Sequence, residues 1–303
     1  MSPQLPRITI ITPSFNQGTL IEETIQSVVD QGYPNLEYIV IDGGSTDCTR
    51  NVLEQYDDQI SYWVSEADRG QAHAVNKGIS RATGDVIGYL NSDDLLTSNA
   101  LSVIGNHVRG HTDRPAIWSF AGASFDPDGT ERTFLPGTRP RLSEWIWGHS
   151  SLFQPSTFWT RQLHDEVGLF NEDFVFSFDK EFFVRSTFQF GRYQSGTDDI
   201  VSRFRVHDNS KTATILEHRE QENDLIRRLV FENATLFKAL LAECRHHRYQ
   251  TLMTSHYECQ HRFQSASLLV RAGLAEKSML FSRQYLGAWR QLFFGRTSGT
   301  QGT

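Results

Sequence analysis

Residues 8–16 read ITIITPSFN, and residues 38–47 read YIVIDGGSTD. In both stretches a run of apolar, mostly β-branched residues stops abruptly at small polar residues, proline or glycine. Short apolar runs that end in turn-forming residues are typical of β-strands covered on both faces. The runs of this kind in the first half of the chain cover residues 8–12, 38–41, 60–64 and 86–90.

Segments with a different pattern separate these runs. Their apolar residues recur about every 3.6 positions, the period of an amphipathic helix, and they cover residues 20–29, 49–56 and 72–82. Strands that alternate with helices in this way predict βαβ crossovers and a mainly parallel, Rossmann-like sheet of the α/β class. After residue 113 the pattern changes to short strand-like pieces broken by Pro and Gly, an aromatic helix is expected over residues 178–190, and residues 215–294 look helical.

The composition excludes several classes of protein. Of the 303 residues, 38% are hydrophobic and 21% are charged, with 29 Lys and Arg against 36 Asp and Glu, which is typical of a globular protein. No apolar run approaches the roughly 18 residues of a membrane-spanning helix, and residues 1–7 lack the apolar core of a signal peptide, so we expect a cytoplasmic protein. Because Cys48, Cys244 and Cys259 are odd in number and widely spaced, we expect neither a disulfide framework nor a zinc site.

The charge is unevenly distributed along the chain. Residues 245–296 carry seven Arg and one Lys against two Glu, a balance of +6, which leaves −13 on the remainder of a chain whose formal charge is −7. An acidic body argues against nucleic acid as a partner, because binding to a phosphate backbone needs a basic surface. The basic segment has apolar residues at near-helical spacing. We therefore expect amphipathic helices there that contact the inner face of an anionic membrane, their own domain or a second subunit.

Polar residues follow all four apolar runs of the first half. In an open parallel α/β sheet the carboxyl ends of the strands form one edge, and ligands bind there. Four consecutive polar strand ends therefore predict a binding site along this edge. They are TPSFNQ at residues 12–17, DGGSTD at 42–47, EADRGQ at 66–71 and NSDD at 91–94. No G-x-G-x-x-G motif follows the first run, which argues against a dinucleotide-binding dehydrogenase.

Two of these strand ends carry carboxylates with a specific chemical use. Asp42 can accept hydrogen bonds from a base or a ribose, or it can simply form the turn before the glycine pair that follows it. Asp93 and Asp94 are adjacent and repel each other unless a cation or a helix N-terminus offsets their charge. One interpretation is that they cap a helix that begins near residue 97. The other is a divalent cation held jointly by one carboxylate and the phosphate oxygens of a substrate.

Taken together, the four motifs resemble those of glycosyltransferase family 2, whose members are inverting enzymes of GT-A fold, and the resemblance extends over about the first 212 residues. It implies a nucleotide-diphosphate sugar as donor (UDP-, GDP- or dTDP-linked) and a divalent cation, Mn²⁺ or Mg²⁺. It also implies a saccharide or lipid-linked acceptor in the synthesis of polysaccharide, lipopolysaccharide or glycolipid. The expected parts are a GT-A domain at residues 1–214, with its nucleotide-sugar half at 1–112 and its acceptor half at 113–214, a helical extension at 215–296 and a disordered tail at 297–303.

The resemblance assigns roles at the strand ends. It implies that the nucleotide sugar is bound by Thr12, Pro13, Ser14, Asn16, Asp42, Gly43, Asp68, Arg69, Gly70, Asn91, Ser92 and Asp94. The metal-binding D-x-D motif of the family corresponds to residues 91–93, where the first acid is an amide in this chain. Because Asn91 contributes no charge, Asp93 is implied to be the metal ligand, with Asp94 beside it facing the metal or the sugar.

Two later segments extend the resemblance. Residues 178–185, FDKEFFVR, resemble the acceptor-side helix whose leading Asp is the general base, which implies this role for Asp179 and makes Glu181 the second candidate. Asp179 can also cap that helix. Residues 204–212, FRVHDNSKT, resemble the loop that closes over the diphosphate, which implies that His207 binds metal or phosphate and that Lys211 pairs with phosphate. Outside this context, His207 would be taken for a surface or capping residue.

The acceptor pocket is expected to be bordered by residues 154–158 and by Trp145, Trp147 and His149, and the two tryptophans equally suit a hydrophobic core. Two other functions stay open. A nucleotidyltransferase would need a basic, glycine-rich loop after the first strand, and residues 14–18, SFNQG, contain no basic residue. A binding protein that keeps the nucleotide pocket without turnover is compatible with the amide at Asn91.

Overall fold

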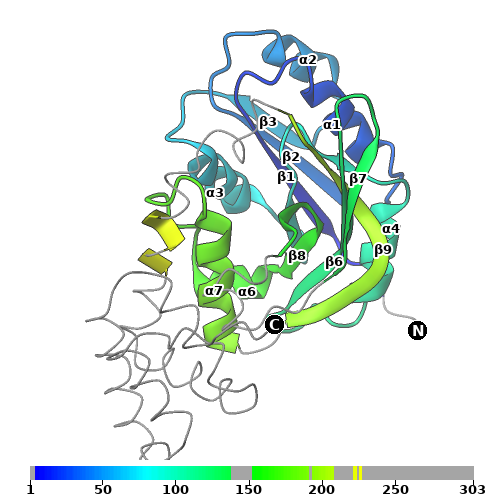
Figure 1. Cartoon of the computed structure of the whole chain (residues 1–303), viewed down its shortest axis with the longest axis vertical. Coiled ribbons are helices and arrows are strands. Elements are labelled where there is room, and N and C mark those ends of the chain that lie inside the picture. Colours follow the sequence, from blue (N-terminus) through cyan, green and yellow to red (C-terminus); the bar gives the residue numbers. More distant parts are fainter. Residues whose placement is uncertain (1–3, 138–151, 191–192, 208–220, 224, 227–303) are drawn as a thin grey trace, which may run out of the picture. The chain divides into compact units, whose positions relative to one another are not determined.

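The computed structural model describes residues 4–137, 152–190, 193–207, 221–223 and 225–226 (Figure 1). Within this part of the chain one 9-stranded sheet has the order β3-β2-β1-β4-β8-β6-β9-β5, and β7 pairs with β6. The strands are β1 (Ile8–Ser14), β2 (Leu36–Asp42), β3 (Tyr62–Ser65), β4 (Val86–Tyr89), β5 (Leu95–Leu96), β6 (Ile117–Phe125), β7 (Glu131–Leu135), β8 (Thr157–Thr160) and β9 (Tyr193–Arg205). The helices are α1 (Ile21–Val29), α2 (Thr49–Gln55), α3 (Gln71–Arg81), α4 (Ala100–Val108), the short η1 (Gln154–Ser156), α6 (Arg161–Val167) and α7 (Phe178–Phe190).

The first four strands form the parallel half of the sheet. β1 pairs with β2 and β4, and β2 pairs with β3, all in parallel. The helices α1, α2 and α3 connect these strands, which confirms the predicted βαβ crossovers. The register places Ser14 beside Asp42 and Asp42 beside Ser65. The carboxyl ends of β1, β2 and β3 therefore lie next to one another.

The second half of the sheet is mixed. β8 pairs antiparallel with β4 and β6, β7 pairs antiparallel with β6, and β9 runs parallel to β6. The two residues of β5 pair antiparallel with β9. The predicted parallel arrangement is therefore confirmed for the strands of the first half. The antiparallel pairs involve strands that follow residue 113, where the sequence pattern changes.

Helices cover both faces of the sheet (Figure 1). On one face Ile10 of β1 belongs to a buried cluster that includes Ile25 of α1 and Ile104 of α4. On the other face α3 lies against β1 so closely that a Cβ added at Gly78 would come within 2.5 Å of Ile11 Cγ2. Successive residues of a strand point to opposite faces, so the continuous apolar run of β1 is explained by burial from both sides.

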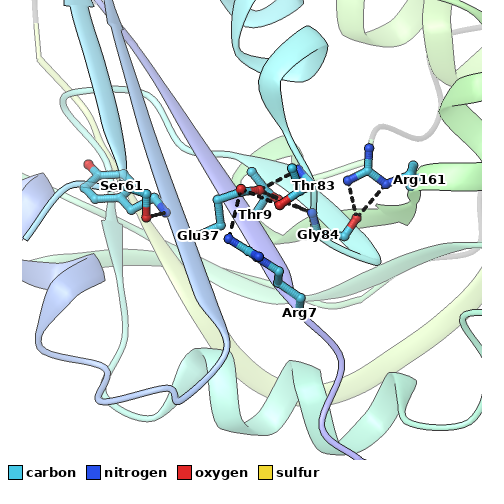
Figure 2. A network of polar contacts seen from close by, with 8 residues as sticks. Arg7, Thr9, Glu37, Ser61, Thr83, Gly84 and Arg161 are labelled. Atoms are coloured by element: carbon cyan, nitrogen blue, oxygen red, sulfur yellow. Dashed lines mark hydrogen bonds and ion pairs between the residues drawn. The ribbon is translucent and has the colours of Figure 1, made fainter.

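A buried carboxylate ties three segments together at the amino-terminal edge of the sheet (Figure 2). Glu37 of β2 accepts hydrogen bonds from the Thr9 hydroxyl and the Thr83 N–H, both at 2.6 Å. It also accepts the Gly84 N–H at 3.2 Å and pairs with Arg7 at 3.1 Å. Burial would raise the pKa of Glu37, but the hydrogen bonds from Thr83 and Thr9 outweigh it and lower the pKa. This network joins β1, β2 and the turn before β4 at the edge away from the predicted site.

The helices α6 and α7 pack through aromatic side chains. Trp159 of β8 contacts Phe182 of α7, and Phe170, from the loop between the two helices, lies with its ring centroid 4.5 Å from that of Phe182. His164 of α6 belongs to this cluster with 5% exposure, and neither of its ring nitrogens has a hydrogen-bond partner among the described residues. Burial lowers the pKa of His164 to about 4.

The buried His164 predicts a pH-dependent loss of stability. The folded chain keeps the imidazole neutral down to a pKa of about 4, whereas the unfolded chain protonates it near 6.5, so between these values protons favour the unfolded state. The contribution of His164 is complete above about pH 6.5 and falls by ~2 kcal/mol between pH 6.5 and 5. Urea denaturation should show a smaller loss of unfolding free energy over this interval in His164→Leu than in the wild type. Equal losses in the two proteins would contradict this account.

Candidate functional site

The loops that follow β1 and β2 interlock at the carboxyl edge of the sheet. Asn16 has a left-handed backbone conformation with φ 53°, which Asn tolerates better than most residues. Its Oδ1 accepts the backbone N–H of Thr46 at 2.9 Å, and its own N–H donates to Ser45 Oγ at 2.7 Å. The N–H of Gly43 donates to the carbonyl of Ser14 at 2.8 Å. The two segments that are predicted to bind the nucleoside are thus held together.

The polar side chains of β1 differ in what they contact. The Thr12 hydroxyl is buried and hydrogen-bonds with Tyr38 Oη at 3.1 Å, and Pro13 beside it is also buried. Ser14 Oγ is buried at the strand end with no hydrogen-bond partner among the described residues. Buried hydroxyls are normally satisfied, so Ser14 is better placed than Thr12 to hydrogen-bond a ligand.

Asp42 is fully buried at the end of β2. Its Oδ2 accepts the backbone N–H of Ser45 at 2.9 Å and the hydroxyl of Ser65 at 2.6 Å, and its Oδ1 accepts the Ser45 hydroxyl at 2.5 Å. Asp42 therefore forms the turn considered from the sequence. A carboxylate oxygen can accept about two hydrogen bonds, which leaves one position on Oδ1, and contact with a ligand stays a prediction.

The third strand end lies against the second. A Cβ added at Gly43 would be 2.7 Å from Asp68 Oδ2, so these two predicted site residues are neighbours. Asp68 Oδ1 accepts the N–H of Gly70 at 2.7 Å. Gly70 has φ 112°, a conformation that favours glycine, and it precedes the first residue of α3.

Arg69 connects this strand end to the loop before α7. Its Nε and Nη2 donate to Glu172 Oε2 at 3.0 and 2.5 Å, and Asn76 Nδ2 donates to Glu172 Oε1 at 3.1 Å. Burial raises the pKa of Glu172, but the hydrogen bonds from Asn76 and Arg69 outweigh this effect and lower it. The sequence assigned no role to Glu172, because its partners are 96 and 103 positions away.

The fourth strand end is a network of amides and carboxyls. Gln71 Nε2 donates to Asn91 Oδ1 at 2.6 Å, and Asn91 Nδ2 donates to Asp94 Oδ2 at 3.2 Å. Asp94 is fully buried, as Ser92 nearly is, and Asp94 Oδ1 accepts the backbone N–H of Arg205 at 3.1 Å. Burial and the adjacent charge of residue 93 raise the pKa of Asp94 well above its usual range.

Asp93 and His207 meet at the same strand end. His207 Nε2 lies 3.0 Å from Asp93 Oδ2, although the residues are 114 positions apart. Their side chains are only partly buried, with 15% and 16% exposure. Helix capping is wrong as an account of Asp93, because β5 follows at once and α4 begins only at Ala100.

The spacing of this pair is compatible with two ligands of one divalent cation. Adjacent ligands of an octahedral cation at ~2.1 Å lie about 3 Å from each other, which matches the separation of Asp93 Oδ2 and His207 Nε2. No group of three His, Cys, Asp or Glu side chains suited to a metal occurs in the described part of the chain. Mg²⁺ commonly completes its coordination with water and the phosphate oxygens of a substrate.

Arg205 is a site residue that the sequence did not reveal. Its Nε donates to the carbonyl of Asp93 at 3.1 Å, and its Nη2 donates to Glu23 Oε2 of α1 at 2.5 Å. Arg205 is buried, and these bonds hold the end of β9 against the end of β4. No local pattern marks them, because Arg205 and Glu23 are 182 positions apart.

Asp179 is the second residue of α7 and is half-buried. Its Oδ1 accepts the backbone N–H of Lys180 at 2.7 Å. Burial, followed by the negative charges of Asp179 and Asp94, raises the pKa of the Tyr89 phenol at the end of β4 well above its usual range. Phe178, which precedes Asp179, stacks on Tyr89 with ring centroids 5.9 Å apart, so the first turn of α7 lies at the end of β4.

Glu181 has a different environment from Asp179. It is 3% exposed and pairs with Arg185 at 2.5 Å. Arg185 also donates to the carbonyls of Val167 and Leu169, so the carboxylate of Glu181 contributes to the packing of α7.

Gln154, from the expected border of the acceptor pocket, donates to the carbonyl of Tyr89 at 2.7 Å. Several predicted features lie outside the described residues: Lys211, Trp145, Trp147, His149, the tail, and the helical extension apart from residues 221–223 and 225–226.

The chain is similar in sequence to known glycosyltransferases. A family model described as Glycosyl transferase family 2 matches residues 9–166. The putative teichuronic acid biosynthesis glycosyltransferase TuaG of Bacillus subtilis is 38% identical over 129 residues, which cover 41% of this chain and 50% of that protein. The chain thus spans half the length of this relative.

Solved structures share the fold. TarS 1–349 of S. aureus in complex with UDP-GlcNAc matches with a TM-score of 0.64 at 17% identity, covering 94% of this chain and 80% of that chain. The mannosyltransferase PcManGT from Pyrobaculum calidifontis, in complex with GDP-Man and Mn²⁺, matches with a TM-score of 0.55 at 18% identity, covering 98% of this chain and 90% of that chain. These similarities confirm the predicted GT-A fold.

The hydrogen bonds of Asp42 predict that its substitution lowers the free energy of unfolding. In Asp42→Asn an amide N–H₂ replaces one acceptor oxygen, so the side chain can no longer accept all three hydrogen bonds, which should cost ~1–3 kcal/mol of unfolding free energy. Urea denaturation of the variant and the wild type measures this difference. The exposed Asp58 supplies the control, because Asp58→Asn changes no buried hydrogen bond and should match the wild type. Equal stability of the two variants would contradict the role of Asp42 in the turn.

Proposed function

We propose that this chain, which belongs to glycosyl transferase family 2, transfers a sugar from a nucleotide-diphosphate donor to an acceptor hydroxyl with inversion at the anomeric carbon. The observation that carries the proposal is the arrangement of three side chains around the end of β4. Asp93 lies against His207, and Phe178, the residue before Asp179, stacks on Tyr89 at the end of β4. The first pair suits a cation, and Asp179 suits a base.

The nucleotide end of the donor would bind along the ends of β1, β2 and β3. Asp42 retains one acceptor position on Oδ1, and Ser14 Oγ has no partner among the described residues. Such groups suit the hydroxyls of a ribose and the polar edge of a base. The similar structures hold UDP-GlcNAc and GDP-Man, and we infer UDP, GDP or dTDP as the nucleotide here.

Asp93 and His207 would hold the divalent cation, Mn²⁺ or Mg²⁺. When bound, such a cation stabilises the negative charge that gathers on the departing diphosphate. The side chain of Arg205 donates to the backbone carbonyl of Asp93, and the backbone N–H of Arg205 donates to the carboxyl of Asp94. The fold thus holds the two proposed ligands next to each other: Asp93 follows β4, and His207 follows β9.

Asp179 would act as the general base. It would accept the proton of the acceptor hydroxyl as that oxygen attacks the anomeric carbon from the face opposite the diphosphate. The bond between the anomeric carbon and the diphosphate oxygen breaks, and its electron pair leaves with the diphosphate. One base is enough for this single displacement, and general-base help is worth ~10²–10⁴-fold. Glu181 is less suited because its carboxylate is paired with Arg185.

The acceptor is proposed to be a saccharide or lipid-linked glycan of the cell surface. The support is the relative TuaG, whose name assigns it to teichuronic acid biosynthesis. Among the described residues, no helix has the length and apolarity to cross a membrane. Contact of the basic residues 245–296 with a membrane or a second subunit stays a prediction, because that segment lies outside the described part.

The donor can be identified by thermal shift. UDP, GDP, dTDP, UDP-GlcNAc, UDP-glucose and GDP-mannose would each be tested with and without Mn²⁺, because a ligand that binds only the folded state raises Tm. We expect one nucleotide and its sugar to raise Tm, with a larger effect in Mn²⁺, and the sugar form to release its nucleoside diphosphate slowly. Binding without release would favour the non-catalytic alternative.

Substitution of the base should separate chemistry from binding. Asp179→Asn keeps the size of the side chain and loses its basicity, so turnover should fall by ~10²-fold or more while donor affinity stays within about twofold. Nucleoside diphosphate release and calorimetry measure the two quantities. Asp173→Asn, at an exposed position before α7, is the control and should behave as the wild type. Unchanged turnover in Asp179→Asn would refute the assignment.

Substitution of either ligand should remove the effect of the metal. In Asp93→Ala and in His207→Ala, Mn²⁺ should no longer strengthen binding of the selected nucleotide, because each variant lacks one of the two ligands that the chain supplies. The control is His111→Ala, since His111 is exposed and outside the site. Mn²⁺-dependent binding that survives in both ligand variants would place the cation elsewhere.

A further inference from the structure

The loop before α7 is anchored by a carboxylate from a distant part of the chain. Glu222 Oε1 accepts the backbone N–H of Val175 at 2.6 Å, and Glu222 Oε2 accepts that of Ser177 at 2.6 Å. The N–H of Phe176 lies within hydrogen-bond distance of both oxygens, at 3.1 and 3.0 Å. Glu222 is 5% exposed, so these three N–H groups replace the water that an exposed carboxylate would bind.

This contact takes the place of a cap on α7. The helix begins at Phe178, directly after Ser177, and the N–H groups at a helix start attract negative charge. Hydrogen bonds from successive N–H groups to one carboxylate are charge-assisted and hold both partners in a fixed geometry. The carbonyl of Ser177 accepts the N–H of Glu181 at 2.9 Å, so the anchored loop is continuous with the first turn of α7.

A second contact lies on the other side of Asp179. Lys180 Nζ donates to Asn223 Oδ1 at 2.6 Å. Asp179 is therefore flanked by Ser177 and Lys180, which are bound to the consecutive residues Glu222 and Asn223.

The opposite flank of α7 is also fixed. Phe178 stacks on Tyr89 with ring centroids 5.9 Å apart, and Phe182 packs on Phe170 at 4.5 Å. Apolar packing of this kind is non-directional, so it restricts sliding and rotation of the first turn less than hydrogen bonds do. The directional bonds to Glu222 restrict those motions.

We propose that Glu222 is a positioning residue for the transfer reaction, whose carboxylate sets the place and direction of the first turn of α7 and hence of Asp179. This inference rests on the proposed function, because it requires Asp179 to be the base. Glu222 acts through Asp179, by keeping it within reach of the acceptor proton. Transfer rates depend steeply on such geometry, and a misplacement of ~1 Å can cost about 10²-fold.

A purely structural role for Glu222 would have a different signature. General loss of structure lowers donor affinity and turnover together, whereas lost positioning lowers kcat and spares donor affinity. Glu222→Gln is the informative change, because it keeps the size of the side chain but turns a donor N–H₂ toward backbone N–H groups. A positioning role also predicts that the effect disappears once the base itself has been removed.

The test compares the wild type, Glu222→Gln, Asp179→Asn and the double variant, with Glu54→Gln on the exposed part of α2 as the matched control. Turnover is the release of UDP or GDP from UDP-GlcNAc, UDP-glucose or GDP-mannose with Mn²⁺, and donor affinity is measured by calorimetry. Glu222→Gln should lower kcat by ~10–100-fold and change donor affinity by less than about twofold. In the Asp179→Asn background the same change should alter turnover by less than about twofold.

A measurement that does not depend on turnover accompanies the kinetics. Backbone amide hydrogen exchange at residues 175–177 should be faster in Glu222→Gln than in the wild type and unchanged in Glu54→Gln.

Unchanged kcat in Glu222→Gln, with Asp179→Asn inactive, would overturn this inference and leave the proposed function intact. Equal losses in both backgrounds, a parallel loss of donor affinity, or unchanged exchange at residues 175–177 would overturn it as well. Full activity of Asp179→Asn would overturn the proposed function and this inference together.

Discussion

One buried carboxyl, that of Asp94, holds the candidate site together. Its two oxygens accept hydrogen bonds from Asn91, three residues earlier, and from the backbone of Arg205, 111 positions later. Because Asp94 has no exposed surface, water cannot replace these bonds if they are lost, and the ends of β4 and β9 have to stay together. His207 follows Arg205 by two residues, and its position beside Asp93 is a direct consequence.

The two halves of the sheet contribute different parts of the site around this junction. The parallel strands β1, β2 and β3 bring polar loops to one edge, because parallel strands have their carboxyl ends on the same side. In the mixed half, β8 pairs with β4, and Arg205 at the end of β9 hydrogen-bonds to Asp93 and Asp94, which follow β4. The helix α7 then packs on Tyr89 through Phe178 and carries Asp179 to the same strand end. The residues proposed to bind the nucleotide and the proposed base Asp179 thus come from different halves of the chain.

Most of the first half could be predicted from the sequence, since strands buried on both faces and amphipathic helices each have a recognisable pattern. Four motifs at consecutive strand ends predicted a binding site along one edge of the sheet, and the structure places the ends of β1, β2 and β3 side by side there. The two-residue β5 has too few residues to show any period. The partners of Arg205 and Glu222 were also beyond the sequence, because these contacts span 182 and up to 47 positions and each residue alone looks like an ordinary surface charge.

The central claim is that a cation at Asp93 and His207 and a base at Asp179 face the two sides of one bound sugar. A crystal structure with Mn²⁺ and whichever of UDP-GlcNAc, UDP-glucose or GDP-mannose binds would test it most directly. The account predicts Mn²⁺ bound directly to Asp93 and His207, with a carboxylate oxygen of Asp179 directed at the far face of the anomeric carbon. A cation bound to other residues, or an Asp179 side chain turned away from the sugar, would contradict it.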